Sequence, residues 1–284
     1  PNQPIKDIDI TYFTGFLGYM KGKGTLANNT INLYLTKLKS LIIWAKDNNL
    51  CNISEVDLKK MVIKFEEVDI ITLTEDEFNA FKDFDIDSLD LTDLQKGKWK
   101  YAQSRCIIEG LCGLRVSDSG RINYSIENVN GQKFLRMVLS KTRNSSRATP
   151  LIPVTEELQR HLDFVAGSSY SDMNPVSINK YAKKIAEKAG LTREITFVLG
   201  KRGYGEGEKM KLHDLISTHP FRAFCATNLH KYGWNIKEIM TLIGWKKVET
   251  AMKYITTDAD TLAERSRAMV EKQEERKLKF SKTA

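Results

Sequence analysis

Residues 126–139 read IENVNGQKFLRMVL, and this stretch decides the fold class because it holds the clearest β pattern in the chain. Its centre, Asn130-Gly131, is a dipeptide that favours the tight two-residue turn of a β-hairpin. A second turn is expected at 143–146, and a third strand at 148–153. The sequence therefore predicts a three-stranded antiparallel sheet.

Helical patterns dominate on both sides of this sheet. Before it, residues 9–21, 28–47 and 54–65 are expected to form three helices. In the second of these, apolar residues recur at steps of three and four and mark one buried face: Ile31, Leu35, Leu38, Ile42 and Ala45. After the sheet, helices are expected at 155–165, 177–189, 218–232, 236–243, 248–255 and 258–279. The expected fold class is mainly α with a small antiparallel β-sheet, an α+β fold.

Two domains are expected, because 284 residues are long for one compact core. Thr74 and Glu77 have the spacing of a capping box, which starts a new helix. The boundary is therefore placed at 66–72. This division gives a small helical domain over residues 1–70 and a larger domain over residues 71–284.

The excess positive charge lies in the last two thirds of the chain. Residues 101–284 contain 31 basic and 20 acidic residues, a balance of +11, whereas the whole chain carries +8. Such a surface suits a polyanion, because each phosphate neutralised by Lys or Arg releases a counterion. Nucleic acid is therefore the first partner to consider.

Cysteine usage and hydropathy point to a cytoplasmic protein. The four cysteines form no C-x-x-C pair and have few histidines near them, so buried free thiols in a reducing compartment are expected. No apolar run approaches the ~20 residues that a bilayer crossing needs, so no membrane partner is expected. The segment 200–207, GKRGYGEG, lacks the residue order of a phosphate-binding loop and is interpreted as a surface loop.

Five short motifs in the larger domain form an ordered set: Gly113-Leu114-Arg115-Val116-Ser117-Asp118, Ser140-Lys141-Thr142, His219-Pro220-Phe221-Arg222, Gly244-Trp245 and Tyr254. In order and spacing, this set resembles the tyrosine recombinases of the phage integrase family. The interval from His219 to Trp245 is 26 residues, and Tyr254 follows nine residues later. The surrounding residues, such as Leu215-Ile216-Ser217-Thr218, are similar to integrases of mobile elements from Bacteroidetes-type bacteria.

This resemblance implies both an architecture and an activity. Residues 1–70 would be a helical core-binding (SAM-like) DNA-binding domain, and residues 71–284 a tyrosine-recombinase catalytic domain with a C-terminal helix. The implied reaction is site-specific recombination, in which DNA is cut and rejoined through a covalent 3′-phosphotyrosine. Members of the family clamp double-stranded DNA at attachment or recombination sites, and they assemble as homo-tetramers in the synaptic complex. No cofactor and no metal is implied.

The chemistry explains why these residue types occur together. A phosphodiester under attack gains negative charge on its nonbridging oxygens, and the guanidiniums of Arg115 and Arg222 suit those oxygens. His219, at the start of its helix, and Trp245, whose indole can only donate, would add hydrogen bonds to the same phosphate. Tyr254 is the expected nucleophile.

Two further residues complete the expected site, and two positions depart from the commonest family pattern. Lys141, on the hairpin loop, is the expected general acid for the leaving 5′-oxygen. Asp118 is expected to support the site without reacting. Trp245 stands where many members have His, and Ala223 stands where His or Arg is frequent. Neither departure removes an essential group.

Other interpretations stay open. Taken singly, Tyr254 would more often be a packing residue, Arg115 a surface ion pair and Lys141 a solvated turn residue. The joint spacing favours catalysis over these. A type IB topoisomerase, which nicks and relaxes DNA, uses nearly the same residues, and a DNA-binding regulator could keep the fold without cutting. The helix at 258–279 would dock on a neighbouring protomer or remain a solvated tail.

Overall fold

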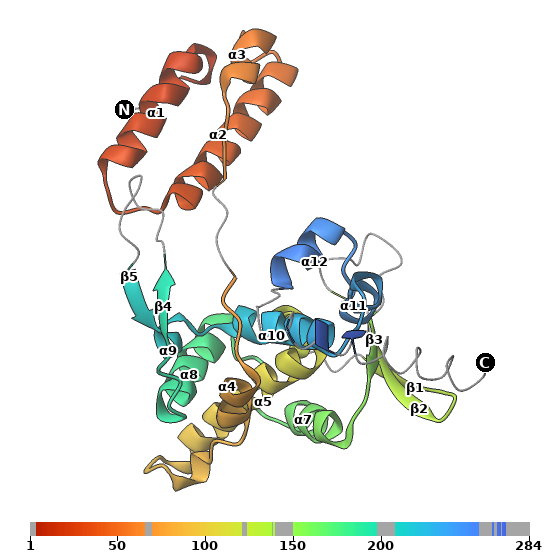
Figure 1. The fold of residues 1–284 in the computed structure, drawn as a ribbon. Helices are drawn as coiled ribbons and strands as arrows, with labels where there is room; N and C mark the ends of the chain where they lie inside the picture. Colours follow the sequence, from red (N-terminus) through yellow and green to blue (C-terminus); the bar gives the residue numbers. More distant parts are fainter. Residues whose placement is uncertain are drawn as a thin grey trace, which may run out of the picture. The chain divides into compact units, whose positions relative to one another are not determined.

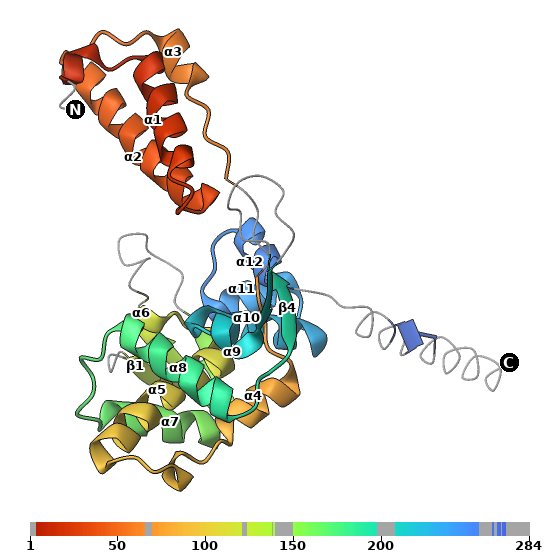
Figure 2. The ribbon, with the colours of Figure 1, turned by 90° about the vertical axis from the view of Figure 1, so that its left-hand side faces the viewer.

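The computed structural model describes residues 4–65, 70–120, 124–137, 139, 150–197, 208–255, 263, 266–267 and 269–270. The chain divides into two compact units. One consists of residues 1–69 together with residues 194–210, and the other of residues 70–193 and 211–284. Figures 1 and 2 show the elements of each unit from two directions.

The first unit contains three helices, α1 (Ile10–Gly22), α2 (Asn28–Asp47) and α3 (Glu55–Lys60), after a short 3-10 turn at Ile5–Asp7. Helices α1 and α2 pack side by side (Figure 1). The predicted stripe of α2 forms the core of this unit, because four of its five residues are buried and Leu38 is partly buried against them. The bounds of α2 agree with the prediction.

The third helix is shorter than the predicted range 54–65. It begins after Ser54, whose hydroxyl caps the backbone N–H of Asp57, and it ends at Lys60. Beyond that point, side chains of α2 take the backbone carbonyls that a continuing helix would use. Lys39 Nζ donates to the carbonyl of Met61 at 2.8 Å, and Asn32 Nδ2 donates to that of Lys64. Contacts with α2 thus replace the last helical turn.

Two short strands, β4 (Glu194–Phe197) and β5 (Glu208–Lys211), form a separate two-stranded sheet. Nearly all of it belongs to the first unit, although it is far from residues 1–69 in sequence. The sequence analysis did not predict these strands. Residues 200–207, interpreted as a surface loop, lie outside the described residues.

The second unit is built around α5 (Asp93–Cys112), which packs against α7 (Glu156–Ala166), α8 (Pro175–Lys188) and α10 (Thr218–Lys231). Every residue of α5 from Tyr101 to Gly110 is buried, so the helix has no solvated face there. That is why the periodicity of the sequence did not mark it. The helix ends at Cys112, and the C-cap residue Gly113 has a φ of 62°.

The predicted sheet is present in this unit. Strands β1 (Tyr124–Val129), β2 (Gln132–Met137) and β3 (Leu151–Pro153) are antiparallel and lie in that order. Asn130 and Gly131 both have positive φ, as the predicted two-residue turn requires. In the core, Leu135 pairs with Ile152, and both are buried. The predicted turn at 143–146 and the start of the third strand lie outside the described residues.

The remaining elements of the second unit are α4 (Glu75–Lys82), a 3-10 turn (Ile86–Ser88), α6 (Val116–Ser119), α9 (Leu212–Leu215), α11 (Ile236–Ile243) and α12 (Val248–Tyr254). The predicted capping box of Thr74 and Glu77 begins α4. Of the predicted helix 258–279, only residues 263, 266, 267, 269 and 270 are described, and they are helical. Among the described residues, no helix combines the length and the apolar character that a membrane crossing requires.

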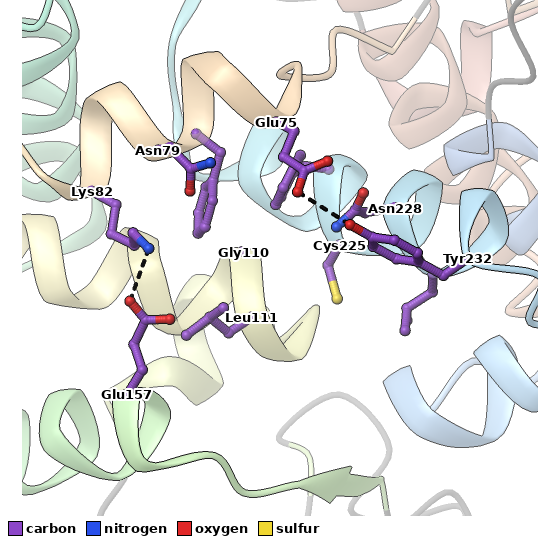
Figure 3. A pocket seen from close by; sticks show the side chains of 12 residues that line it. Glu75, Asn79, Lys82, Gly110, Leu111, Glu157, Cys225, Asn228 and Tyr232 are labelled. Carbon is purple, nitrogen blue, oxygen red and sulfur yellow. Dashed lines mark hydrogen bonds and ion pairs between the residues drawn. The ribbon is translucent and has the colours of Figure 1, made fainter. Parts of the chain in front are cut away.

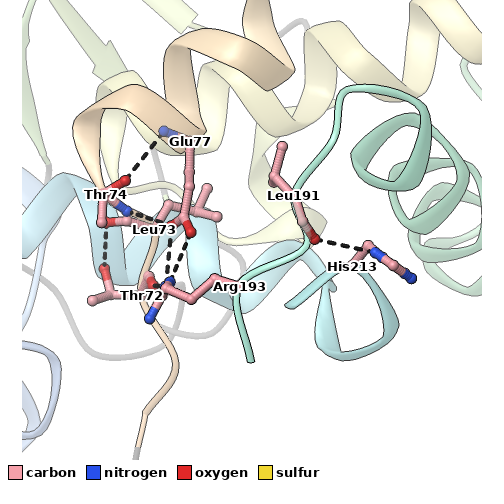
Figure 4. Close-up of polar contacts among 7 residues, drawn as sticks. All are labelled: Thr72, Leu73, Thr74, Glu77, Leu191, Arg193 and His213. Atoms are coloured by element: carbon pink, nitrogen blue, oxygen red, sulfur yellow. Dashed lines mark hydrogen bonds and ion pairs between the residues drawn. The ribbon is translucent and has the colours of Figure 1, made fainter. Parts of the chain in front are cut away.

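Glu77 has a second partner, Arg193 (Figure 4). Arg193 donates from Nε and Nη2 to the two oxygens of the Glu77 carboxylate, at 2.7 and 3.0 Å, and from Nη2 to the carbonyl of Thr72 at 2.9 Å. This fork joins the residue that precedes β4 to the segment that leads into α4.

The fold is mainly α with small antiparallel sheets, which is the predicted class.

Candidate active site

Arg115 follows directly on the end of α5. The left-handed Gly113 stops the helix, and Arg115 then serves as the N-terminal flanking residue of α6. Its carbonyl accepts hydrogen bonds from the backbone N–H groups of Asp118, at 2.7 Å, and Ser119, at 2.9 Å. A side chain at Gly113 would meet Ile243 of α11, so only glycine permits this approach. The short helix α6 therefore sets where Arg115 lies.

Arg222, on α10, lies near Arg115 and contacts the end of α5. Its side chain is 2% exposed, and Nη1 donates to the carbonyl of Gly113. Burial, together with the positive charge of Arg115, lowers the pKa of Arg222 to about 10. The guanidinium therefore stays charged at neutral pH. Two like charges held close together in a buried place favour an anion between them.

Trp245 and Tyr254 extend this cluster from α11 and α12. The left-handed Gly244 ends α11, and Trp245 follows it with a buried indole. The guanidinium of Arg222 lies over this indole, 5.0 Å from the ring centroid, and the ring of Tyr254 lies 5.0 Å from it on a tilt of 31°. The Tyr254 side chain is half-buried at the edge of the core, not enclosed within it.

Three donors of this cluster have no acceptor in the part of the chain that the structure describes. Among the described residues, Nη1 of Arg115, Nη2 of Arg222 and Nε1 of Trp245 are buried without a hydrogen-bond partner. A buried donor left unsatisfied costs ~1–3 kcal/mol of stability, so such groups seldom gather without a purpose. An oxyanion with several acceptor oxygens, such as a phosphodiester, would satisfy them together.

The other predicted site residues are placed less fully. His219 lies in the first turn of α10, three residues before Arg222, with an exposed side chain. Asp118 is 1% exposed and belongs to α6, three residues after Arg115 in the chain. Lys141 lies outside the described residues.

Comparison with known proteins identifies the family of the chain. The model of the phage integrase family matches residues 73–260, a range that takes in all six predicted site residues. The chain belongs to the phage integrase family. It is 24% identical over 162 residues to the tyrosine recombinase XerC of Rickettsia prowazekii, a match that covers 56% of this chain and 49% of that protein. The chain thus spans about half the length of the curated relatives it matches.

Solved structures of the phage integrase family share the fold. A λ integrase dimer bound to a core site has a TM-score of 0.61 at 17% identity, over 91% of this chain and 83% of that one. A λ integrase tetramer bound to a Holliday junction has a TM-score of 0.58, also at 17% identity, over 90% of this chain and 67% of that one. At such identities the likeness establishes the architecture.

The sequence analysis of this phage integrase family chain did not find a buried polar cluster behind Arg115. Arg105 and Glu109 on α5 are 5% and 1% exposed, and both bond to Ser119 of α6. Burial raises the pKa of the Glu109 carboxyl well above its ordinary value, and Asp118 adds to this. The hydrogen bond from Ser119 and the charges of Arg105 and Arg222 oppose the shift. No periodic pattern in α5 marked these residues.

This integrase family chain also has a cavity away from the predicted residues (Figure 3). Its volume is about 230 Å³, and residues of α4, α5, α7 and α10 line it. Tyr232 donates to Glu75 at 3.1 Å across one part, and Lys82 lies 3.0 Å from Glu157 across another. None of the five described site residues lines it. The cluster of unsatisfied donors, and not this cavity, is therefore the candidate active site.

Proposed function

We propose that the chain is a site-specific DNA recombinase, a tyrosine-type strand transferase that acts as an integrase. It cuts and rejoins DNA through a covalent 3′-phosphotyrosine. The observation that supports this most directly is the set of unsatisfied buried donors on Arg115, Arg222 and Trp245, next to the ring of Tyr254. A scissile phosphate bound there would complete their hydrogen bonds and meet a nucleophile at the same place.

The proposed cutting step is a transesterification. The Tyr254 oxygen attacks the phosphorus of a DNA phosphodiester, a bond forms between them, and the bond from phosphorus to the 5′-oxygen breaks. The phenol gives its proton to solvent, the departing 5′-oxygen takes one from Lys141, and solvent returns a proton to that lysine. Rejoining reverses this step with the 5′-hydroxyl of another strand as the nucleophile. The phosphotyrosine conserves the bond energy, so no cofactor takes part.

The arginines would carry the electrostatic part of the catalysis. Attack by Tyr254 concentrates negative charge on the nonbridging oxygens, where Arg115 and Arg222 supply donors that are already in place. The guanidinium of Arg222 is anchored on the carbonyl of Gly113, and the backbone of Arg115 is held by α6. His219 would add a hydrogen bond from the start of α10, where the helix dipole also favours an anion.

The substrate and the assembly belong to the same proposal. Residues 1–70 act as a helical core-binding domain on double-stranded DNA, and residues 71–284 form the catalytic domain. The basic balance of residues 101–284 suits that partner. A homo-tetramer on two attachment or recombination sites of a mobile element is the proposed synaptic complex, since the similar λ integrase forms a tetramer on a Holliday junction. The four buried free cysteines suit a cytoplasmic location.

A covalent-trap assay tests the proposal. The substrate is attachment-site DNA from the source element, nicked next to the cleavage position so that the short fragment with the new 5′-hydroxyl diffuses away. The protein should then remain joined to the DNA in a denaturing gel. Tyr254→Phe should bind the same duplex with unchanged affinity and form no adduct. A wild-type protein that binds but gives no adduct would instead be a DNA-binding regulator.

Product analysis separates recombination from topoisomerase action. Two plasmids that carry the site should yield recombined junctions, and plasmids that lack it should remain supercoiled. Relaxation of both plasmids without exchange would favour the type IB topoisomerase.

A further inference from the structure

A third arginine, Arg105, contacts α6, the short helix that follows Arg115. Arg105 is in the buried stretch of α5, ten positions before Arg115, and its side chain is 5% exposed. It donates from Nε to the hydroxyl of Ser119 at 3.0 Å and from Nη1 to the hydroxyl of Tyr101 at 3.0 Å. Nη2 donates to the carbonyl of Val116. The whole fork is therefore engaged within the protein.

These bonds hold both ends of α6. Val116 is the first residue of this helix and Ser119 is the last. Ser119 also donates its backbone N–H to the carbonyl of Arg115 and its hydroxyl to Glu109 Oε1, at 2.9 and 3.0 Å. A continuous chain of hydrogen bonds thus runs from the guanidinium of Arg105 through Ser119 to the backbone of Arg115.

Gly120 indicates that the sequence accommodates this arrangement. Its φ of −101° is open to any residue, so the backbone does not require glycine. A Cβ at this position, however, would lie under 3.0 Å from three atoms of the Arg105 guanidinium. Glycine at 120 therefore leaves room for the Arg105 fork against α6.

We propose that Arg105 is a positioning residue of the strand-transfer site: it fixes α6 and thereby places Arg115 against the scissile phosphate, without touching DNA itself. This inference rests on the proposed function. An electrostatic site of this kind depends on donors held in place before the reaction, and a displacement of ~1 Å can cost on the order of 100-fold in rate. Arg105 supplies that support through Ser119 and Val116.

Two substitutions disturb the contact from opposite sides. Arg105→Lys keeps the charge and removes the fork, and Gly120→Ala keeps Arg105 and pushes its guanidinium away from α6. Gly167→Ala is the matched control, because a Cβ there meets one backbone oxygen at the ordinary distance of 3.4 Å. Ser119→Ala removes one hydroxyl and serves as the mildest probe if either variant folds poorly.

The measurements are the single-turnover rate of adduct formation on saturating nicked DNA, duplex affinity, and hydrogen exchange of α6. We expect Arg105→Lys and Gly120→Ala each to slow adduct formation by about 10- to 100-fold, with affinity within about threefold, since neither residue contacts phosphate. Amide exchange at Asp118 and Ser119 should be faster in both variants. The double variant should be no slower than Arg105→Lys alone, because both changes break one contact.

Several results would overturn the inference. Adduct formation within twofold of wild type in folded Arg105→Lys would do so, and so would losses that multiply in the double variant. If wild type forms no adduct, the proposed function fails. Hydrogen exchange of α6 then still tests separately whether Arg105 holds this helix. Unchanged exchange at Asp118 and Ser119 in both variants would then reject the positioning role, whereas faster exchange would support it.

Discussion

The guanidinium of Arg222 lies over the face of the Trp245 indole, 5.0 Å from its centroid. The negative face of an indole attracts a cation, and the attraction is stronger where water is excluded. The ring edge meanwhile keeps its Nε1–H unbonded among the described residues. Trp245 therefore contacts one proposed phosphate-binding group, the Arg222 guanidinium, with its face and carries another, Nε1–H, at its edge. The Tyr254 ring packs on the same indole.

Substitutions at Trp245 should separate these two roles. Trp245→Phe keeps an aromatic face and loses the N–H, so adduct formation should slow by about tenfold, the usual effect of one hydrogen bond to a charged group. Trp245→His keeps a donor and should remain active. Its rate relative to wild type should rise as pH falls through ~6.5, where imidazole gains a second N–H. A ratio that stays flat from pH 5.5 to 8 would show that the second N–H adds nothing, and a Trp245→Phe rate equal to that of wild type would exclude donation from this position.

Arg222→Ala should abolish cleavage while duplex affinity stays within about tenfold. One phosphate contact is a small part of a large charged interface, but it stabilises the transition state directly. Single-turnover cleavage should fall by about 1000-fold or more. Arg136→Ala is the control, because Arg136 forms an exposed pair with Glu127 and should change neither quantity much. An equal loss of binding and cleavage in Arg222→Ala would mean that this residue chiefly maintains the fold.

Glu109→Gln should stabilise the protein at neutral pH. The folded state raises the pKa of this carboxyl above its ordinary value near 4.5, so it binds the proton more tightly than the unfolded state does. That contribution to stability is complete below pH 4.5 and is lost as pH rises through the folded pKa, by at most ~1.4 kcal/mol per pH unit. The variant has no such loss. The difference in melting temperature between Glu109→Gln and wild type should therefore grow as pH rises from 4.5 towards the raised pKa of Glu109 in the folded protein.

The matched substitution for this experiment is Glu127→Gln. Glu127 is exposed and paired with Arg136, so its removal should give a melting difference that is small and nearly constant with pH. If both variants behave alike, burial of Glu109 has no bearing on the pH dependence.

Gly113→Ala should cost more than Gly190→Ala. Both glycines have positive φ, 62° and 80°, so both substitutions carry the ~1–2 kcal/mol penalty of a left-handed backbone. Only at position 113 would the new Cβ also meet a side chain, that of Ile243 at 2.8 Å, which adds ~1–3 kcal/mol of overpacking. Urea unfolding of the two variants measures the difference. Equal losses in the free energy of unfolding would show that Ile243 and α11 move aside without an energetic cost.

Elements could be predicted from the sequence where the local pattern of residues matches the face that the fold buries or the backbone conformation that a turn needs. Helix α2 has one apolar face against its unit, and Asn130-Gly131 sets a turn that needs positive φ at both positions. Helix α5 was missed for the opposite reason. Its residues from Tyr101 to Gly110 are all buried, and Gln103 and Arg105 among them are satisfied by bonds to residues outside the helix, such as Phe81 and Ser119.

The candidate site could likewise be predicted only in part. Motif spacing identified Arg115, Arg222, Trp245 and Tyr254, and the structure brings these four together. Spacing along the chain carries no information on how the group is supported. The bonds that join Arg105 to α6 depend on packing between α5 and the turn after it, so they became visible only in three dimensions.

The grouping of residues 194–210 with residues 1–69 has a practical consequence for recombinant fragments. The polypeptide passes from one unit to the other after Asp69, Arg193 and Met210, so a single cut cannot yield two self-contained pieces. A protein that starts at Ile70 would carry β4 and most of β5 without the helices with which they group, and an isolated N-terminal piece would lack them. Biochemists who dissect this protein should therefore keep the chain whole or bridge positions 193 and 211 with a short linker.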